Sequence, residues 1–317
     1  MTLFNEILKA EERIRSYIKE TKLEYSTSLS KLGNCHVYLK LENQQNTGSF
    51  KLRGAMNSLL ALSLDSDKKN FVTASSGNHG AAFAYGISKL KLNGMIFLPE
   101  NASPVKIEAL KKDKVEIKQY GNDCVQAEIY ARKYAEENNS TFISPYNDLN
   151  VIAGQGTIGV ELDNQIDDID YVLVPIGGGG LISGIAGYLK HKSGKIKIIG
   201  CQPSNSPVMY ESIKAGKIVE YESLPTLSDG TAGGLENNSI TFEYCQKYVD
   251  DYILLSEEEI KEALKFMYKE HEMIVEGAAA LSVAAFIKEK PKFAGSKIVL
   301  LITGSKISVE RFQEIIN

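Results

Sequence analysis

The sequence predicts an α/β protein with two mostly parallel sheets that carry helices on both faces. Short β-rich runs alternate along the 317 residues with segments whose apolar residues recur at helical spacing, as in proteins built on parallel sheets. The run at residues 171–176 is apolar throughout, which is typical of a strand buried on both faces. Together the strand and helix units are numerous enough for two sheets in two lobes.

Each element is predicted from its own pattern. Strands are expected where β-rich runs lie between turn residues, at residues 37–41, 71–74, 94–98, 115–120, 141–143, 171–176, 195–200, 251–255 and 298–303. Helices are expected where apolar residues follow the helical period, at residues 1–20, 80–92, 104–112, 125–137, 181–190 and 309–316. Two further helices follow start signals, one after the turn at residues 47–49 and one after the capping box at residues 256–259.

Composition favours small-molecule chemistry in a reducing compartment. The 36 basic and 40 acidic residues give a formal charge of -4, which offers no electrostatic surface for nucleic acid or an anionic membrane. The longest apolar stretch, residues 278–287, is too short to span a bilayer. Four widely separated cysteines indicate neither a disulfide framework nor a zinc site, so we expect a cytoplasmic protein.

Lys51 lies between a flexible turn and an apolar-periodic run, which places it in the first turn of a helix. The positive end of the helix dipole disfavours a cation there, so a neutral or covalently engaged amine would fit this position better than an ammonium. Taken alone, this stretch also fits a solvated surface lysine.

Residues 75–80 follow a predicted strand and lead into a predicted helix. The backbone N–H groups at the helix start, together with the hydroxyl and amide groups of Ser75, Ser76 and Asn78, form a suitable site for a carboxylate. A capped turn without a ligand is the alternative. His79 has no partner at metal-ligand spacing among the other histidines, so no metal role is expected for it.

Four consecutive glycines, residues 177–180, follow the buried strand and open the next predicted helix. Their backbone can wrap around a phosphate at the helix N-terminus, although a plain flexible loop also fits the pattern. No Lys-Ser or Lys-Thr pair completes a Walker motif, and no register through these glycines gives G-x-G-x-x-G. The loop therefore favours the compact phosphate of a cofactor over a nucleotide.

Residues 154–159 do match G-x-G-x-x-G, which would indicate an NAD-dependent oxidoreductase. The context does not support this alternative, because little strand precedes the motif and no ribose-binding acid lies about 20 residues further on. We interpret the segment as a glycine-bearing helix that packs closely against a neighbour.

The lysine turn, the carboxylate site and the phosphate site occur together with matching motifs along nearly the whole chain, at residues 37–43, 47–55, 75–80, 151–161, 174–180, 229–230, 276–277 and 300–304. In this combination the sequence resembles the serine/threonine dehydratase family of pyridoxal-phosphate (PLP) enzymes. This is the fold-type II or tryptophan synthase β-like group, which includes threonine ammonia-lyase and serine racemase. The resemblance implies PLP as the cofactor and a two-lobed α/β fold.

The resemblance also implies roles for the matched residues. The implied cofactor-binding residues are Phe50, Lys51, Asn78, the phosphate-binding Gly177, Gly178, Gly179 and Gly180, Glu276 and Thr303. The implied substrate-binding residues are Ser75, Ser76, Gly77, Asn78 and His79. Lys51 is the implied Schiff-base lysine and base for the α-proton, Phe50 flanks the ring and Asn78 contacts the ring hydroxyl. Glu276 lies near the ring edge and Thr303 contacts the pyridine nitrogen.

The activity implied is that of an ammonia-lyase, which converts a β-hydroxy amino acid, L-threonine and/or L-serine, to a 2-oxo acid and ammonia by α,β-elimination. A neutral Thr303 hydroxyl at the pyridine nitrogen favours prompt elimination over a long-lived carbanion. Ser76 permits an alternative, because in serine racemase a serine at the matching position is the acid/base opposite the lysine. The catalytic residues of a racemase would then be Lys51 and Ser76. A silent amino-acid sensor is a further alternative, against which the retained Lys51 argues.

By analogy with the family, a large cofactor-binding domain comprises residues 1–60 and 148–317, and residues 61–147 form a small mobile domain. We expect a homodimer whose ligand is a small-molecule amino acid. Residues 303–306 read Thr-Gly-Ser-Lys where the family usually has Ser-Gly-Gly-Asn. The metal-using branch has acidic ligands where this chain offers Gln202, Ser206 and Val208, so no metal site is predicted.

Overall fold

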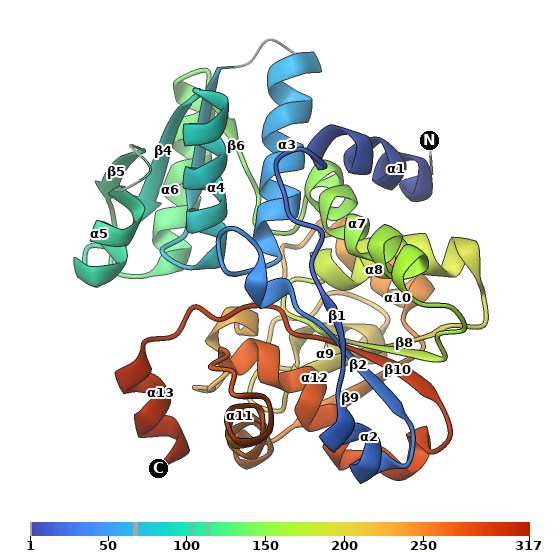
Figure 1. The fold of residues 1–317 in the computed structure, drawn as a ribbon. Helices are drawn as coiled ribbons and strands as arrows, with labels where there is room; N and C mark the ends of the chain where they lie inside the picture. Colours follow the sequence, from blue (N-terminus) through green and yellow to red (C-terminus); the bar gives the residue numbers. More distant parts are fainter. Residues whose placement is uncertain (1, 66–68, 103, 112, 114) are drawn as a thin grey trace.

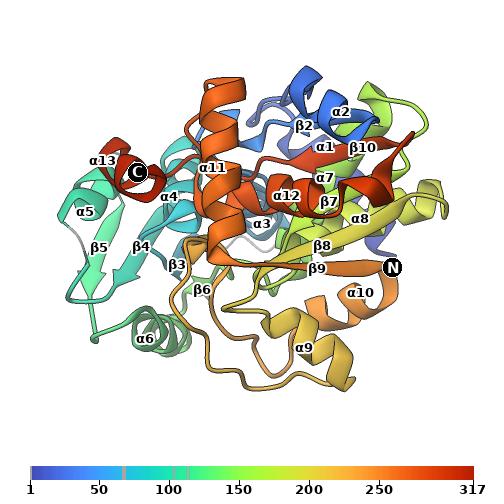
Figure 2. The same ribbon diagram turned by 90° about the horizontal axis from the view of Figure 1, so that it is seen from below.

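The computed structural model describes residues 2–65, 69–102, 104–111, 113 and 115–317. It contains one six-stranded and one four-stranded sheet, each flanked by helices (Figure 1; Figure 2). Neighbouring strands are parallel throughout both sheets except for the antiparallel pair at one edge of the larger sheet. The predicted α/β class with two mostly parallel sheets is therefore confirmed.

The larger sheet has the order β1-β2-β10-β7-β8-β9. Its strands are β1 (Leu23–Tyr25), β2 (His36–Lys40), β7 (Tyr171–Pro175), β8 (Lys197–Pro203), β9 (Asp251–Leu255) and β10 (Lys297–Leu301). The smaller sheet has the order β5-β4-β3-β6. Its strands are β3 (Asn70–Ala74), β4 (Asn93–Leu98), β5 (Glu116–Gln119) and β6 (Thr141–Phe142).

The helices lie between these strands in the chain. The α-helices are α1 (Leu3–Ile14), α2 (Thr27–Gly33), α3 (Lys51–Asp65), α4 (Asn78–Leu90), α5 (Pro104–Lys111), α6 (Cys124–Glu137), α7 (Leu149–Gln165), α8 (Gly180–Lys192), α9 (Val208–Ala215), α10 (Ile240–Tyr248), α11 (Glu257–His271), α12 (Gly277–Lys288) and α13 (Val309–Ile316). Short 3-10 turns are η1 (Glu42–Gln44), η2 (Asp229–Thr231) and η3 (Lys290–Phe293). None of the helices in the described ranges has both the length and the apolar character that a membrane span needs.

Alternation along the strands of the larger sheet builds a core on each face. Leu173 and Leu300 belong to the core that α2, α11 and α12 cover, whereas Val172 and Val299 belong to the core under α1, α7 and α8. Successive strand residues point to opposite faces, so two buried faces require apolar residues at every position. This explains the continuous apolar run of β7. The helix α3 lies against α4 of the smaller sheet on one side and α1 and α7 on the other (Figure 1).

Several element boundaries differ from the predicted ones. The N-terminal helix ends at Ile14 instead of continuing to residue 20, and α4 begins at Asn78, two residues earlier than expected. The helix predicted at residues 104–112 is observed as α5, and Lys112 lies outside the described residues. The helix α12, whose residues 277–286 are all buried, was not predicted from the sequence. A helix that is buried all round has no polar face, so its sequence lacks the amphipathic period.

Residues 154–159 lie in the middle of α7 and not at a strand-to-helix turn. The NAD-binding interpretation is therefore wrong, and the predicted close-packed helix is confirmed. A Cβ atom on Gly154 would lie 2.5 Å from the Arg53 carbonyl oxygen of α3. The glycine thus lets α3 and α7 approach each other directly beneath the lysine turn.

We predict that Gly154→Ala lowers the free energy of unfolding by about 1–3 kcal/mol, because the added methyl group overlaps the backbone of α3. Urea denaturation followed by circular dichroism measures the change. Gly194→Ala is the matched control, since a Cβ there meets nothing within 4 Å. Equal stability of the two variants would contradict the close-packing account.

Candidate active site

The segments that follow β2, β3, β7 and β10 carry most of the predicted site residues. The turn before Lys51 is joined to the segment after β10 by backbone hydrogen bonds, from Phe50 N–H to the Thr303 carbonyl at 3.1 Å and from Ser305 N–H to the Gly48 carbonyl at 3.1 Å. Ser49 and Gly304 also form an isolated β-bridge. The lysine turn and Thr303 are therefore held side by side, as expected for the carboxyl ends of neighbouring parallel strands.

Lys51 is the first residue of α3, as predicted. Its Nζ donates a hydrogen bond to the Pro145 carbonyl oxygen at 2.8 Å and lies 5.3 Å from the centroid of the Phe50 ring. Desolvation lowers the pKa of Lys51 from 10.5 to about 8, and the Glu276 carboxylate acts in the opposite direction. The interpretation of Lys51 as a solvated surface lysine is thus excluded.

Residues 75–80 connect β3 to α4, and the structure corrects their local form. Asn78 and His79 lie in the first turn of α4 rather than in a loop, because the helix begins at Asn78. No side chain caps this helix start. Ser75 and Ser76 are half-buried, and the Ser75 hydroxyl accepts a hydrogen bond from Gly77 N–H at 3.2 Å. Uncapped N–H groups next to these hydroxyls form a suitable binding site for a carboxylate.

His79 is buried and neutral. Its Nε2 lies 3.1 Å from the Ile143 carbonyl oxygen. Burial and, to a smaller extent, the charge of Lys51 lower the pKa of His79 from 6.5 to about 3, while the hydrogen bond to Ile143 acts in the opposite direction. A neutral imidazole here orients the turn without adding charge to the site.

The glycine loop opens α8, with Gly179 as the N-terminal capping residue at a φ of 84°. This backbone conformation favours glycine, and no side chain caps the first N–H groups of α8. A Cβ atom on Gly178 would overlap the ring of Tyr146. The loop is therefore closely packed, and its interpretation as a plain flexible loop is excluded. Its N–H groups remain available to bind an anion.

Glu276 and Asn78 connect the two sheets across the site. Asn78 Nδ2 donates to both Glu276 carboxylate oxygens at 2.9 Å, and Lys306 N–H donates to Glu276 Oε2 at 3.1 Å. Burial raises the pKa of Glu276, while the hydrogen bonds from Asn78 and Lys306 lower it and the Asp229 charge raises it. Lys306, where the family usually has asparagine, also donates from Nζ to the Gly77 carbonyl at 3.1 Å.

Several buried polar atoms at this site have no hydrogen-bond partner within the described residues, among them Asn78 Oδ1, His79 Nδ1 and Thr303 Oγ1. Buried polar atoms are seldom left unpaired, so each indicates a missing partner. A hydroxyl that can face a pyridine nitrogen, an uncapped glycine-rich helix start and an amine with a lowered pKa match the chemical groups of PLP. The residues present therefore fit this cofactor.

The sequence did not indicate the contribution of residues 144–147. The Pro145 carbonyl accepts from Lys51, and the next residue, Tyr146, packs on Gly178 and accepts a hydrogen bond from Glu236 N–H at 2.9 Å. These contacts connect the lysine to the glycine loop. No periodicity or motif marks them, because they depend on where the chain returns from β6 to α7.

Gln202 and Ser206, where the sequence predicts no metal site, make contacts within the protein. Gln202 Oε1 accepts from Tyr210 N–H at 2.8 Å, and the Ser206 hydroxyl lies 2.6 Å from that of Ser223. No group of three or more His, Cys, Asp and Glu residues that could hold a metal occurs among the described residues.

Comparisons with known proteins agree on one family. The model of the pyridoxal-phosphate-dependent enzyme family matches residues 14–304. An L-threonine ammonia-lyase of Thermotoga maritima is 37% identical over 317 residues, which is 100% of this chain and 79% of that protein. Among solved structures, threonine deaminase isoform 2 of Solanum lycopersicum has a TM-score of 0.93 at 31% identity, covering 99% of this chain and 92% of that one. Maize serine racemase has a TM-score of 0.91 at 32% identity, covering 98% and 95%.

We predict that labelling of Lys51 by trinitrobenzenesulfonate in the cofactor-free protein rises with a midpoint near pH 8, because only the neutral amine reacts and desolvation lowers its pKa to about 8. In Glu276→Gln the midpoint moves to lower pH, since a carboxylate that stabilises the ammonium is lost. Peptide mass mapping at each pH measures the labelled fraction.

A free lysine peptide, with a pKa of about 10.4, is the reference for this titration. A Lys51 midpoint equal to that of the peptide, or an upward shift in Glu276→Gln, would contradict the account.

Proposed function

Because the chain belongs to the family of pyridoxal-phosphate-dependent enzymes, we propose that it is an ammonia-lyase that acts on a β-hydroxy amino acid, L-threonine and/or L-serine. The products are a 2-oxo acid and ammonia, and the water lost with the β-hydroxyl is returned on hydrolysis. The observation that carries the proposal is the Lys51 amine, whose pKa is lowered to about 8. Its turn is bonded to the Thr303 carbonyl, and its acceptor Pro145 precedes Tyr146, which packs on Gly178 of the glycine loop.

Different residues of the chain bind the cofactor and the substrate. The uncapped N–H groups of residues 177–180 would hold the cofactor phosphate, Phe50 would flank the ring and Asn78 would contact the ring hydroxyl. Glu276, which accepts both hydrogen bonds from Asn78 Nδ2, would lie near the ring edge. The substrate carboxylate binds at the start of α4, on Ser75, Ser76, Gly77, Asn78 and His79.

Lys51 acts as the base. A lysine with an ordinary pKa is protonated at neutral pH, but desolvation keeps a useful fraction of Lys51 neutral near pH 8. The neutral Nζ takes the α-proton of the substrate, and the β-hydroxyl leaves. When bound, PLP takes up the charge that develops at the α-carbon. The Thr303 hydroxyl would contact the pyridine nitrogen without holding it protonated, so the cofactor would stabilise this charge weakly and elimination would be favoured.

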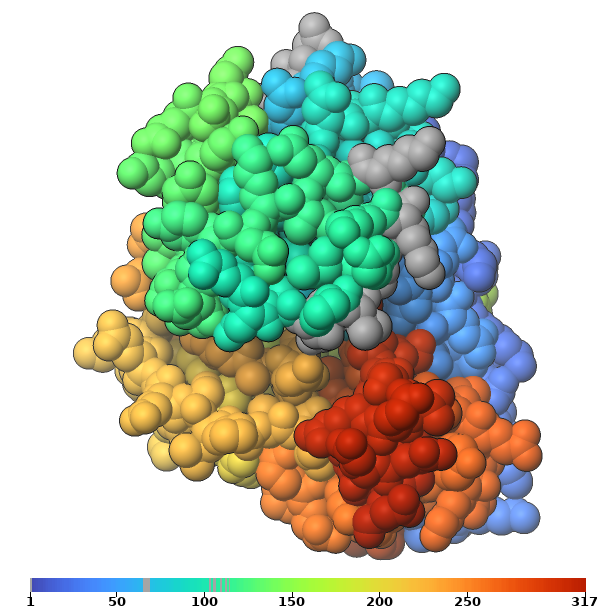
Figure 3. Space-filling view, turned by 90° about the vertical axis from the view of Figure 1, so that its left-hand side faces the viewer, coloured from blue at the N-terminus to red at the C-terminus, as the bar shows by residue number. Residues whose placement is uncertain are grey.

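We further propose that residues 61–147 form the small mobile domain and that residues 1–60 and 148–317 form the large one. The strands of the four-stranded sheet fall within the first range, which supports this division. Its substrate-binding turn is joined to the remainder by the Asn78–Glu276 and Lys306–Gly77 contacts. Figure 3 shows the α6 region of this range above the golden segment near residue 220 and the red C-terminal segment. Crystals with and without a substrate analogue test whether the two parts close.

The proposed enzyme is a cytoplasmic homodimer. Cys35, Cys201 and Cys245 are buried free thiols and Cys124 is an exposed one, which suits a reducing compartment. Light scattering coupled to size-exclusion chromatography tests the dimer.

Serine racemisation is a second candidate, favoured by Ser76 at the position of the racemase acid/base and by the likeness to maize serine racemase. Elimination remains the preferred activity, since it needs Lys51 alone as base. An assay with threonine, serine and 3-hydroxyaspartate, with ammonia and serine enantiomers measured in parallel, separates the two. Enantiomer exchange faster than ammonia release would reverse the ranking.

We predict that Ser76→Ala reduces racemisation by at least about 100-fold and ammonia release by less than about 10-fold, because only racemisation needs a proton donor opposite Lys51. Chiral chromatography and a coupled assay for the 2-oxo acid measure the two rates. Lys51→Ala is the control and loses both activities. An equal loss of both activities in Ser76→Ala would contradict the assignment of Lys51 as the sole base for elimination.

A further inference from the structure

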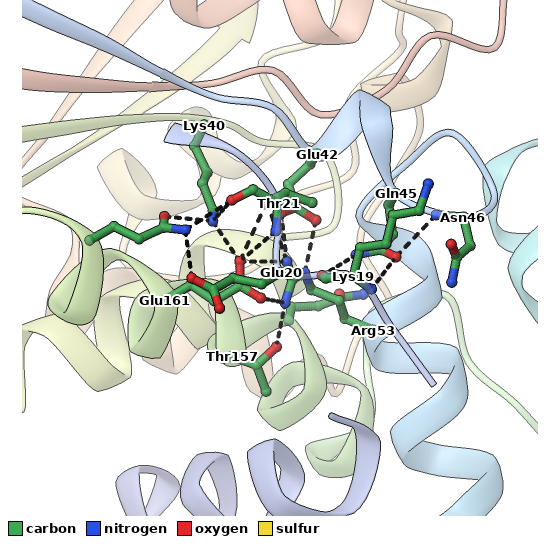
Figure 4. Close-up of polar contacts among 12 residues, drawn as sticks. Lys19, Glu20, Thr21, Lys40, Glu42, Gln45, Asn46, Arg53, Thr157 and Glu161 are labelled. Carbon is green, nitrogen blue, oxygen red and sulfur yellow. Dashed lines mark hydrogen bonds and ion pairs between the residues drawn. The ribbon is translucent and has the colours of Figure 1, made fainter. Parts of the chain in front are cut away.

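A cluster of buried charged side chains lies beneath the lysine turn (Figure 4). We call Lys40, Glu42, Arg53 and Glu161 the buried ion network. Their side chains are at most 3% exposed, and they come from β2, η1, α3 and α7. None of them has a role in the mechanism above. Buried charges are costly, so a network of this size calls for an explanation beyond stability.

Arg53 is the centre of this network. Its Nε and Nη2 donate to the two carboxylate oxygens of Glu42, both at 2.8 Å. Its Nη1 and Nη2 donate to those of Glu161, at 2.7 and 2.9 Å, and Nη1 also donates to the Thr157 hydroxyl at 3.1 Å. One planar guanidinium thus holds two carboxylates bidentately. A lysine has neither the planar fork nor enough donors to reproduce this arrangement.

The four residues of the network carry two cations and two carboxylates, and Glu161 also pairs at 3.0 Å with the half-buried Arg15, which in turn pairs with Glu11. Lys40 Nζ lies 2.5 Å from Glu161 Oε2 and donates to the Thr21 carbonyl at 2.8 Å. Burial opposes ionisation of Glu161, but Arg53 and Lys40 outweigh it and lower its pKa to about 2. The causes of the lowered pKa of Lys51 are desolvation and, in the opposite direction, Glu276. The contacts of the network bear on Lys51 through the geometry of the turn that carries it.

Arg53 lies two residues after Lys51 in the first turn of α3. Within this turn, Arg53 N–H donates to the Phe50 carbonyl at 3.0 Å, and Gly54 N–H donates to Gln155 Oε1 of α7 at 3.2 Å. The guanidinium adds side-chain bonds to η1 and α7. Two separate elements, η1 and α7, thus fix the turn that carries Lys51.

We propose that Arg53 is a positioning residue, which together with Glu42 and Glu161 fixes the first turn of α3 and thereby places Lys51 Nζ for reaction. The inference rests on the proposed function of Lys51. Small displacements of a reacting group are expensive, since an error of about 1 Å can cost about 100-fold in rate. The network supplies the rigid support that such placement requires.

The test uses the variant Arg53→Met/Glu42→Gln, which removes one cation and one carboxylate and keeps the network neutral. The expected result is a folded protein whose kcat for ammonia release falls about 10- to 100-fold with little change in KM. A readout independent of turnover is the rate at which the cofactor-free protein gains the visible absorbance of bound PLP, which is expected to fall about 10-fold. Rates are normalised to folded protein by circular dichroism.

Arg53→Lys separates the effect of charge from that of geometry, because it keeps the positive charge and loses the planar guanidinium. It is expected to show the same defects as the double variant. Lys190→Met/Asp250→Asn is the matched control, since it removes an ion pair of 2.6 Å elsewhere in the protein and is expected to behave as wild type. If the Arg53 variants fail to fold, Thr157→Val tests the proposal in their place. Its rate of PLP loading is then expected to fall a few-fold.

Wild-type loading rate and kcat in a folded Arg53 variant, or in Thr157→Val where that variant decides, would overturn the proposal. Failure of the proposed function is a different outcome, because wild-type protein would then release no ammonia from any β-hydroxy amino acid. The loading rate would still test whether Arg53 places Lys51.

Discussion

Desolvation of the Lys51 amine is the constraint on which the rest of the site depends. An ammonium in water neither takes a proton nor attacks a carbonyl carbon, so the fold must hold this group where its neutral form is accessible. The first-turn position favours the neutral amine through the helix dipole, and packing favours it by excluding water. The Glu276 carboxylate works against both effects, because it raises the pKa of Lys51. The same carboxylate accepts a hydrogen bond from Asn78 and so fixes the start of α4.

The way in which the lysine turn is supported follows from the same constraint. A desolvated amine has few partners of its own, and within the described part of the chain the Lys51 amine donates one hydrogen bond, to the Pro145 carbonyl. Its placement must therefore come from the backbone. Backbone hydrogen bonds with Thr303 and Ser305 hold the turn from one side, and the close approach of α7 at Gly154 holds it from the other. The buried ion network joins these supports beneath the turn.

Local signals in the sequence predicted the parts of the site that depend on neighbouring residues. The helix start at Lys51, the glycine loop before α8 and the capping box at Ser256 each follow from a few adjacent side chains, and the structure contains all three. Partners distant in the chain were not predictable in this way. Glu161 meets Arg53 across 108 positions, and Pro145 meets Lys51 across 94. Such pairs depend on how α7 and β6 pack, which no local pattern records.

The most direct test of the central claim, that Lys51 holds the cofactor, is borohydride reduction of the purified protein followed by mass mapping of the peptides. The account predicts visible absorbance that disappears on reduction, and a pyridoxyl adduct on Lys51. An adduct on another lysine, or no adduct in a protein that binds PLP, would contradict it.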